Sequence, residues 1–276
     1  MDIINRIFDT VFDVIFAPFV EIDTIWGMLA VSFFFFFLML LIFKATSNQS
    51  GIKKAKNRVK AHFLAIRLYR DDIGLMFETM RNILASNGQY LKTSMRPMLF
   101  LIVPVALVLI HVGARYEYRP LEVGESTVVT AQLDKSVSEE SLRAIDLILP
   151  EGLIVETDPV RVVQLREISW RIKAVKEGTY QIGFRGGDNR VITKQIVVKN
   201  ALASLSPQVA KSNLAVTLLN PSEASLPDDS HFASIFVQYP VRTFELLGFA
   251  SHWLVAFFLF SLLFAFSLKG FMRVEF

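Results

Sequence analysis

The stretch that decides the fold is Ile25–Phe43, which reads IWGMLAVSFFFFFLMLLIF and contains no charged residue in 19 positions. About 20 apolar residues in a helix cross a hydrocarbon core roughly 30 Å thick. Pro97–Ala114 and Leu246–Leu268 meet the same criterion, with 18 and 23 residues and no Asp, Glu, Lys or Arg. We therefore predict three transmembrane helices, over 25–43, 97–114 and 246–268. The alternative, three buried helices of a soluble core, is less favoured because such helices are rarely this long and apolar.

The overall composition also favours a membrane protein. Of the 276 residues, 53% are hydrophobic and only 20% are charged, whereas about 25% are charged in typical soluble domains. The chain has no cysteine, which excludes a disulfide framework, a Cys-ligated zinc site and a thiol nucleophile.

The charge is distributed unevenly along the chain. The segment between the first two spans, Lys44–Arg96, holds 11 basic and 3 acidic residues and so carries a net charge of +8, whereas the whole chain carries +3. Short loops rich in Lys and Arg stay on the cytoplasmic side of a membrane. This predicts that Lys44–Arg96 lies inside, that the N-terminus and the long segment 115–245 lie outside, and that the C-terminal tail lies inside.

The N-terminal segment 1–20 has one polar and one apolar helix face. This periodicity predicts an amphipathic helix, and such a helix lies in the membrane interface with its apolar face among the acyl chains. The alternative is a helix docked on the outer domain. The polar residues, spaced i, i+3, i+4, i+7, i+8 and i+11, are Asp2, Asn5, Arg6, Asp9, Thr10 and Asp13.

Residues 48–92 carry two apolar stripes with helical spacing. The first stripe precedes Asp71-Asp72 and repeats in alternating steps of three and four residues, as in coiled coils. The second lies between Asp71-Asp72, a candidate N-cap, and Ser86-Asn87-Gly88, a candidate C-cap with Gly88 in the left-handed region. We therefore predict an antiparallel helical hairpin in the cytoplasm.

The first arm of this hairpin is strongly basic. We expect it to contact an anionic partner, either ribosomal RNA or anionic lipid headgroups, because each Lys or Arg near an anionic lipid surface contributes about 1 kcal/mol and phosphate contacts act similarly. The alternative is that these charges only fix the topology and solvate the hairpin. The seven candidate contact residues are Lys53, Lys54, Lys56, Arg58, Lys60, Arg67 and Arg70.

The segment 116–200 changes to short β-rich runs separated by turn signals such as Glu177-Gly178. Six or seven short strands in roughly 85 residues predict an all-β, immunoglobulin-like sandwich outside the membrane. The next segment, 201–240, is rich in Ser, Pro and Asn, and we expect a loop region or short strands that lie over the sandwich. The predicted strands are 126–133, 144–149, 160–164, 168–175, 179–185 and 191–198.

The sequence contains no constellation of residues that points to catalysis. The four histidines are widely scattered, and none lies three or four residues from another. A Gly-rich phosphate loop and a Gly-x-Ser-x-Gly motif are absent from the sequence. We therefore expect no enzyme activity, no metal site and no cofactor.

The order of these segments resembles the YidC–Oxa insertase superfamily, which includes three-span archaeal and ER-complex members. The likeness is carried by the helix 1–17, the hairpin 48–92 and the motif Met95-Arg96-Pro97-Met98 at the start of the second span. It covers residues 1–115 and 240–276, and the β-domain is inserted between the second and third spans.

The resemblance implies a membrane protein insertase or chaperone that helps short client membrane proteins enter the bilayer without ATP. It also implies a groove between the spans that opens to the cytoplasm. In such a groove, a client meets Lys44 and Arg96 first. The deeper polar residues are Ser32, Ser261 and Ser267. Bacterial members place an Arg at mid-membrane, whereas no predicted span of this chain contains Lys or Arg.

A second hypothesis comes from another functional class. The chain is then a non-catalytic scaffold subunit of a membrane complex, whose outer β-domain binds an envelope partner. Polar residues from several spans around one groove favour the insertase, whereas tightly packed apolar helices favour the scaffold. Under either hypothesis, we expect an integral protein of a prokaryotic inner (plasma) membrane.

The predicted topology can be tested by proteolysis. Protease added to cells with a permeabilised outer layer and an intact inner membrane is expected to cut within 116–240 and to spare 48–92, because the net charge of +8 holds the hairpin inside. Immunoblots against tags placed in the two segments report the cleavage. Cleavage of the hairpin with protection of 116–240 would reverse the topology.

Overall fold

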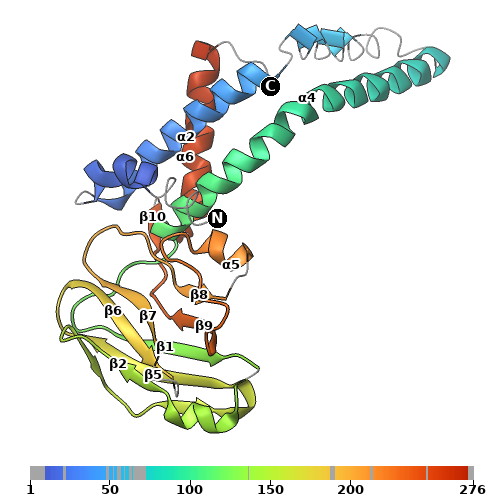
Figure 1. Ribbon diagram of the computed structural model, residues 1–276. Helices are drawn as coiled ribbons and strands as arrows, with labels where there is room; N and C mark the ends of the chain where they lie inside the picture. The colour runs from blue at the N-terminus through green and yellow to red at the C-terminus, as the bar shows by residue number, and fades with distance from the viewer. Residues whose placement is uncertain are drawn as a thin grey trace. The chain divides into compact units, whose positions relative to one another are not determined.

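The computed structural model describes residues 10–20, 23–47, 50–51, 53–54, 57–58, 60–61, 64, 73–135, 137–186, 190–211, 214–246 and 248–272. Figure 1 shows the chain as ribbons. The chain divides into two compact units. The first, here called the β unit, comprises Met1–Met28 and Leu109–Ala256, and the second, the helical unit, comprises Leu29–Val108 and Phe257–Phe276.

Two helices among the described residues are long and apolar enough to cross a membrane. They are α2, Thr24–Thr46, and the stretch Pro97–Tyr116 of α4, which itself spans Ile73–Tyr116. The apolar part of α6, which spans Trp253–Met272, is shorter and ends at Leu268. The described residues between 50 and 64 are also helical.

Helix α2 begins and ends at polar residues that satisfy its free backbone groups. The Asp23 carboxylate accepts a hydrogen bond from the Ile25 N–H at 3.0 Å, as an N-cap does. At the other end, the Thr46 hydroxyl donates to the Ile42 carbonyl at 2.7 Å. Lys44 lies in the last turn, where a positive charge is favourable to the helix dipole. The observed helix therefore extends the predicted span 25–43 by one residue at its start and three at its end.

Helix α4 runs without interruption through the positions at which we predicted a break. Its 44 residues correspond to a length of about 66 Å. Gly88 lies inside the helix and has no positive φ, so the predicted C-cap at Ser86-Asn87-Gly88 is wrong. Pro97 is likewise an internal residue and not a helix start. Proline costs one helical hydrogen bond, and the helix formers on both sides of it keep the chain helical.

The predicted third span began too early. Leu246 ends strand β10, Phe244–Leu246, which pairs with β11, Phe249–Ser251. Gly248, between these strands, has a φ of +83°, a conformation that glycine adopts at little cost. Helix α6 starts only after His252, whose ring nitrogen accepts a hydrogen bond from the Leu254 N–H at 3.3 Å. The apolar residues before His252 therefore form a short hairpin.

The β unit contains two antiparallel sheets that pack face to face. The larger has the order β3-β5-β1-β9-β8, with β4 also paired to β5, and the smaller has the order β2-β6-β7. The strands of the larger sheet are β1 Ser126–Leu133, β3 Leu153–Val155, β4 Val160–Val162, β5 Glu167–Ala174, β8 Gln208–Ala210 and β9 Phe232–Val237. Those of the smaller are β2 Asp146–Ile148, β6 Gly178–Arg185 and β7 Val191–Val198.

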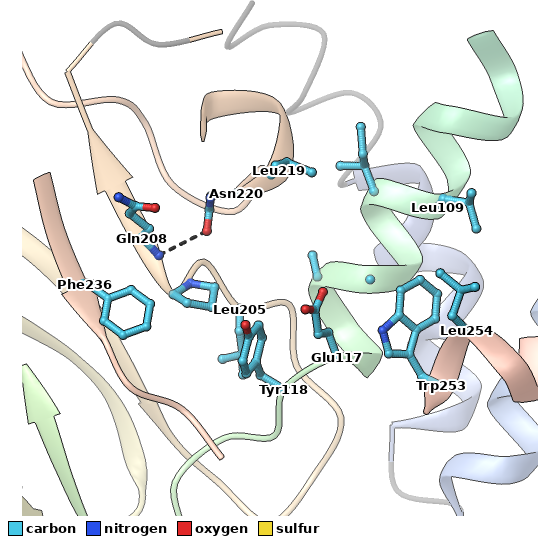
Figure 2. A pocket seen from close by; sticks show the side chains of 14 residues that line it. Leu109, Glu117, Tyr118, Leu205, Gln208, Leu219, Asn220, Phe236, Trp253 and Leu254 are labelled. Atoms are coloured by element: carbon cyan, nitrogen blue, oxygen red, sulfur yellow. Dashed lines mark hydrogen bonds between the residues drawn. The ribbon is translucent and has the colours of Figure 1, made fainter. Parts of the chain in front are cut away.

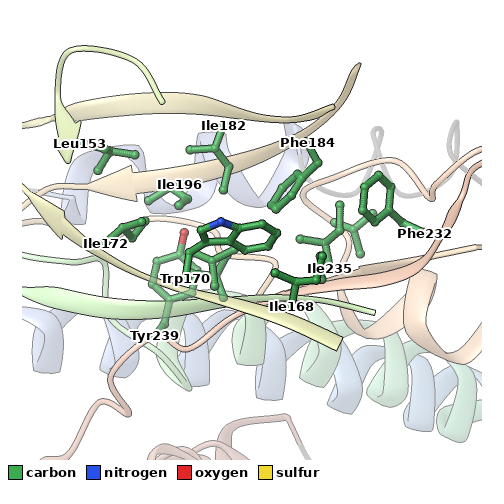
Figure 3. Close-up of a cluster of buried hydrophobic side chains, with 14 of the residues drawn as sticks. Leu153, Ile168, Trp170, Ile172, Ile182, Phe184, Ile196, Phe232, Ile235 and Tyr239 are labelled. Atoms are coloured by element: carbon green, nitrogen blue, oxygen red, sulfur yellow. The ribbon is translucent and has the colours of Figure 1, made fainter. Parts of the chain in front are cut away.

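A single hydrophobic core fills the space between these sheets (Figure 3). Alternate residues of β1 and β5 are buried, as the two-residue repeat of a strand requires. At the centre, the Trp170 ring meets the Phe184 ring edge-on, with 5.7 Å between centroids. Phe184 in turn meets Phe232, at 5.8 Å. Aromatic residues from β5, β6 and β9 thus join the two sheets.

The segment 201–240, predicted as a loop region or short strands over the sandwich, contributes part of this core. It contains β8, helix α5 (Leu214–Leu219) and β9. Strand β9 pairs with both β1 and β8, so it lies inside the larger sheet. The predicted end of the β-domain at residue 200 was therefore too early. The Ser- and Pro-rich surroundings concealed an alternating strand in which Phe232, Ile235 and Val237 are buried.

A buried ion pair attaches this segment to the edge strand β7. The Lys194 ammonium is fully buried, pairs with the Glu223 carboxylate and also donates to the Ser206 carbonyl. Burial lowers the pKa of Lys194. Glu223 also accepts from the Gln195 N–H at 3.0 Å, and the Tyr239 hydroxyl accepts from the Val197 N–H at 3.2 Å. Side chains thereby occupy two backbone donors of β7.

The place of β9 in the core can be tested by two substitutions on the same strand. We expect Phe232→Ala, at a residue only 1% exposed, to lower the free energy of unfolding by about 3–5 kcal/mol. Phe236→Ala is the matched control, and its ring is 38% exposed, so the expected loss is about 1–2 kcal/mol. Chemical denaturation of the full chain in detergent, followed by near-UV circular dichroism, measures both. Equal losses would contradict the assignment of Phe232 to the core.

Candidate functional site

Two of the predicted groove residues, Ser32 and Ser261, are buried within the helical unit. Ser32 on α2 is 0% exposed and Ser261 on α6 is 6% exposed. Neither hydroxyl has a hydrogen-bond partner among the described residues. A hydroxyl buried without a partner costs free energy, and each such group in a protein calls for an explanation. The two serines are therefore the strongest candidates for a polar site within the helices.

Aromatic and aliphatic contacts hold α2 against α6 near these serines. The rings of Phe35 and Phe257 lie 5.2 Å apart, and those of Phe33 and Phe264 lie 5.3 Å apart. Towards Lys44, Leu40 and Phe43 form a second cluster, against which Leu101 of α4 and Leu268 of α6 pack. All three helices thus meet in an apolar cluster, and the serines lie on two of them.

The other predicted groove residues are distributed differently. Lys44 is exposed in the last turn of α2. Ser267 is exposed on α6, and its hydroxyl donates to the Leu263 carbonyl one turn earlier, at 2.9 Å. Arg96 lies in the interior of α4, and its side chain is outside the described part of the structure. Ser267 therefore differs from Ser32 and Ser261, because it is exposed and already hydrogen-bonded to its own helix.

The basic residues of the hairpin are described in part. Lys53, Lys54, Arg58 and Lys60 lie on helical residues and have exposed side chains. Lys56, Arg67 and Arg70 fall outside the described residues. Exposed cations are accessible to phosphate groups, and the contact with an anionic partner stays a prediction.

A buried arginine that the sequence analysis missed lies at the end of α4. Arg115 is 2% exposed, pairs with the Asp13 carboxylate and donates to the His111 carbonyl at 3.1 Å. Its guanidinium lies over the rings of Phe12 and Phe16, at 5.9 and 5.4 Å from their centroids. Cation–π contacts of this kind are favourable when the cation is desolvated.

These contacts dock the N-terminal helical segment on the end of α4 within the β unit. The His111 ring stacks on Phe12, with 5.0 Å between centroids, and the Tyr116 ring contacts Phe16 at 5.6 Å. The residues Thr10–Phe16 are helical and continue into the short helix η1, Ala17–Phe19. A docked helix was the alternative to a purely interfacial one. Arg115 was overlooked because it follows the predicted span 97–114 by one residue, whereas the observed apolar helix continues to Tyr116.

A cavity of about 410 Å³ lies in the β unit beside the last turns of α4 and the first turn of α6 (Figure 2). Apolar residues from both helices line one side, among them Leu109 and Leu254. The rest of the lining is mixed, with the polar residues Glu117, Gln208 and Asn220 among further apolar ones. Its residues come from separate parts of the chain, so no local sequence signal marks it. Among the described residues, no three His, Asp or Glu side chains gather closely enough to hold a metal ion.

The docking role of Arg115 can be tested by hydrogen exchange. We expect Arg115→Ala to speed amide exchange in Asp13–Phe19 and to cost about 1–3 kcal/mol in stability, because it removes a charged hydrogen-bonding partner. Mass spectrometry of the full chain in lipid nanodiscs measures the exchange. The control is Arg143→Ala, at an exposed arginine of the same unit, which is expected to leave exchange in Asp13–Phe19 unchanged. Equal exchange in both variants would contradict the docking role.

Comparisons with known proteins give no match: no family, no curated protein and no solved structure was found to match this chain.

Proposed function

We propose that this chain is a membrane protein insertase or chaperone that helps short membrane proteins enter the bilayer without ATP. The observation that carries the proposal is the pair of buried hydroxyls, Ser32 and Ser261, that have no partner among the described residues. They lie on α2 and α6, which contact each other through aromatic rings. A polar group of a client that entered between these helices would supply the hydrogen bonds that the two serines lack.

The proposal includes a third span and a defined topology. Helix α6 has 20 residues, and a helix of this length reaches about 30 Å, enough to cross a hydrocarbon core. With the +8 segment inside, the N-terminus and the segment 115–245 lie outside and the C-terminus lies inside. We further propose that the chain is an integral protein of a prokaryotic inner membrane.

The β-domain is proposed to be immunoglobulin-like. Two antiparallel sheets with a buried tryptophan, Trp170, between them support this assignment. The exposed Lys53, Lys54, Arg58 and Lys60 support a contact between the hairpin and ribosomal RNA or anionic lipids. Clients are expected to have short, lightly charged outer tails, because neutral hydroxyls attract a charged tail more weakly than a buried arginine does.

A non-catalytic scaffold subunit is the second candidate function, and one specific observation favours it. The cluster of Leu40, Phe43, Leu101 and Leu268 joins α2, α4 and α6 through apolar side chains alone. Tight apolar packing suits helices that only anchor a protein. In this case, the β-domain would bind an envelope partner.

Reconstitution of the purified full chain separates the two candidates. The protein is placed in liposomes with one small model client, and insertion is scored by protease protection. We expect insertion above that of protein-free liposomes, and a reduction of roughly five- to 150-fold in the double variant Ser32→Ala/Ser261→Ala, because two neutral hydrogen bonds of about 0.5–1.5 kcal/mol each are lost. Ser267→Ala is the matched control, since its hydroxyl is already bonded to its own helix.

Stability measurements distinguish a loss of client contact from a loss of folding. The double variant removes two buried hydroxyls without partners, so its thermal stability is expected to be equal to or higher than that of the natural chain. A loss of insertion without a loss of stability therefore supports a role in client contact. Insertion equal to that in protein-free liposomes would reject the insertase and leave the scaffold.

A further inference from the structure

We propose that the cavity between the end of α4 and the start of α6 binds the headgroup of a zwitterionic phospholipid that carries a primary amine. The ammonium group lies at the Glu117 carboxylate, and a phosphate oxygen accepts the indole N–H of Trp253. This site is independent of the proposed insertase function, because all its residues belong to the β unit.

The first observation is a buried hydrogen-bond donor without a partner. Trp253 is 4% exposed, and its indole nitrogen has no hydrogen-bond partner among the described residues. Trp253 lines the cavity, and its nitrogen faces the side on which Glu117 lies (Figure 2). A buried tryptophan usually finds an acceptor for this N–H. The missing acceptor therefore points to a ligand with a polar oxygen.

The second observation is a carboxylate in the same small space. A Cβ atom at Gly113 would lie 3.2 Å from the Trp253 ring and 3.9 Å from a Glu117 carboxylate oxygen, so both groups flank this glycine. Among the described residues that line the cavity, Glu117 is the only charged one. Burial and the adjacent Glu117 carboxylate raise the pKa of the Tyr118 phenol, so Tyr118 remains a neutral donor. The site therefore attracts a cation.

The remaining polar groups of the lining are largely occupied. The Asn220 side-chain oxygen accepts from the Gln208 backbone N–H at 3.1 Å, and its amide donates to the Val216 carbonyl at 3.0 Å. We therefore base recognition on the unpartnered donor, Trp253, and the negatively charged acceptor, Glu117. A ligand that carries both an oxygen acceptor and an ammonium group complements this pair.

The position of the cavity favours a lipid over a soluble ligand. Leu109 and Ile110, which line it, belong to the apolar stretch Pro97–Tyr116 that is long enough to cross a membrane. A volume of about 410 Å³ lies within the usual range for small-ligand sites. The headgroup would occupy the polar end, and an acyl chain would leave along Leu109 and Leu254.

The chemistry also selects among lipid headgroups. The single carboxylate repels anionic headgroups and free phosphate. A primary ammonium donates charge-assisted hydrogen bonds to a carboxylate, whereas a trimethylammonium has no N–H to donate. We therefore expect phosphatidylethanolamine to bind more tightly than phosphatidylcholine, and phosphatidylglycerol to bind least.

Native mass spectrometry of the full chain in detergent, titrated with these three lipids, tests the proposal. We expect Glu117→Gln to weaken phosphatidylethanolamine binding about tenfold, and so to reduce the preference over phosphatidylcholine, because the Gln oxygen can still accept a hydrogen bond but the negative charge that strengthens it is lost. Trp253→Phe keeps an aromatic ring but loses the donor, and is expected to weaken both lipids similarly. Glu245→Gln and Trp26→Phe, at exposed residues, are the matched controls and should change neither.

Three results would overturn the proposal. They are equal binding of phosphatidylethanolamine and phosphatidylcholine to the natural chain, an unchanged preference in Glu117→Gln, and displacement by soluble glycerophosphoethanolamine as effective as that by the lipid. The thermal unfolding midpoint of each variant in lipid-free detergent shows whether it is folded. Glu117→Gln is expected to weaken mainly phosphatidylethanolamine binding, whereas Trp253→Phe is expected to weaken the binding of both lipids. If one variant does not fold, the other still tests the site.

Discussion

The organisation of the β unit depends on one buried charge, the guanidinium of Arg115. An unpaired cation is costly to bury, so its position is stable only because Asp13, the His111 carbonyl and two aromatic faces surround it. The next residue, Tyr116, packs against Phe244 as well as Phe16. A Cβ atom at Gly27 would lie 2.6 Å from the Tyr116 hydroxyl, so only glycine permits this close approach. One turn of α4 therefore positions the N-terminal helix, the first turn of α2 and the β10–β11 hairpin.

The elements with a strong single signal could be predicted from the sequence. Strands β1 and β7 have the predicted bounds 126–133 and 191–198, because each is an eight-residue β-rich run between clear turn signals. Helix α2 agrees with 25–43 within a few residues. Other elements escaped prediction because two local signals competed. Pro97 and Gly88 suggested helix ends within α4, and the Ser- and Pro-rich surroundings of Phe232 concealed β9.

The residues of the candidate sites also fall into those that the sequence indicated and those that it did not. Ser32 and Ser261 are conspicuous as polar residues in long apolar stretches, and the structure buries both. Their lack of a hydrogen-bond partner is a property of the packed helices and could not be inferred from sequence. Arg115 lies one residue beyond the predicted span 97–114, and its burial by Phe12 and Phe16 could not be inferred from the sequence. Trp253 and Glu117 are 136 positions apart in the sequence, so only the fold shows that they share a cavity.

The side chains that cover strand β7 have a consequence for the association of one copy of the domain with another. An uncovered edge strand can recruit the edge of a neighbouring molecule and start a polymer of sheets. In β7, the backbone groups of Gln195 and Val197 are already engaged by Glu223, Tyr239 and Leu121. Many copies of the domain can therefore be packed side by side without joining through this edge. A partner at this edge must recognise side chains instead of adding a strand.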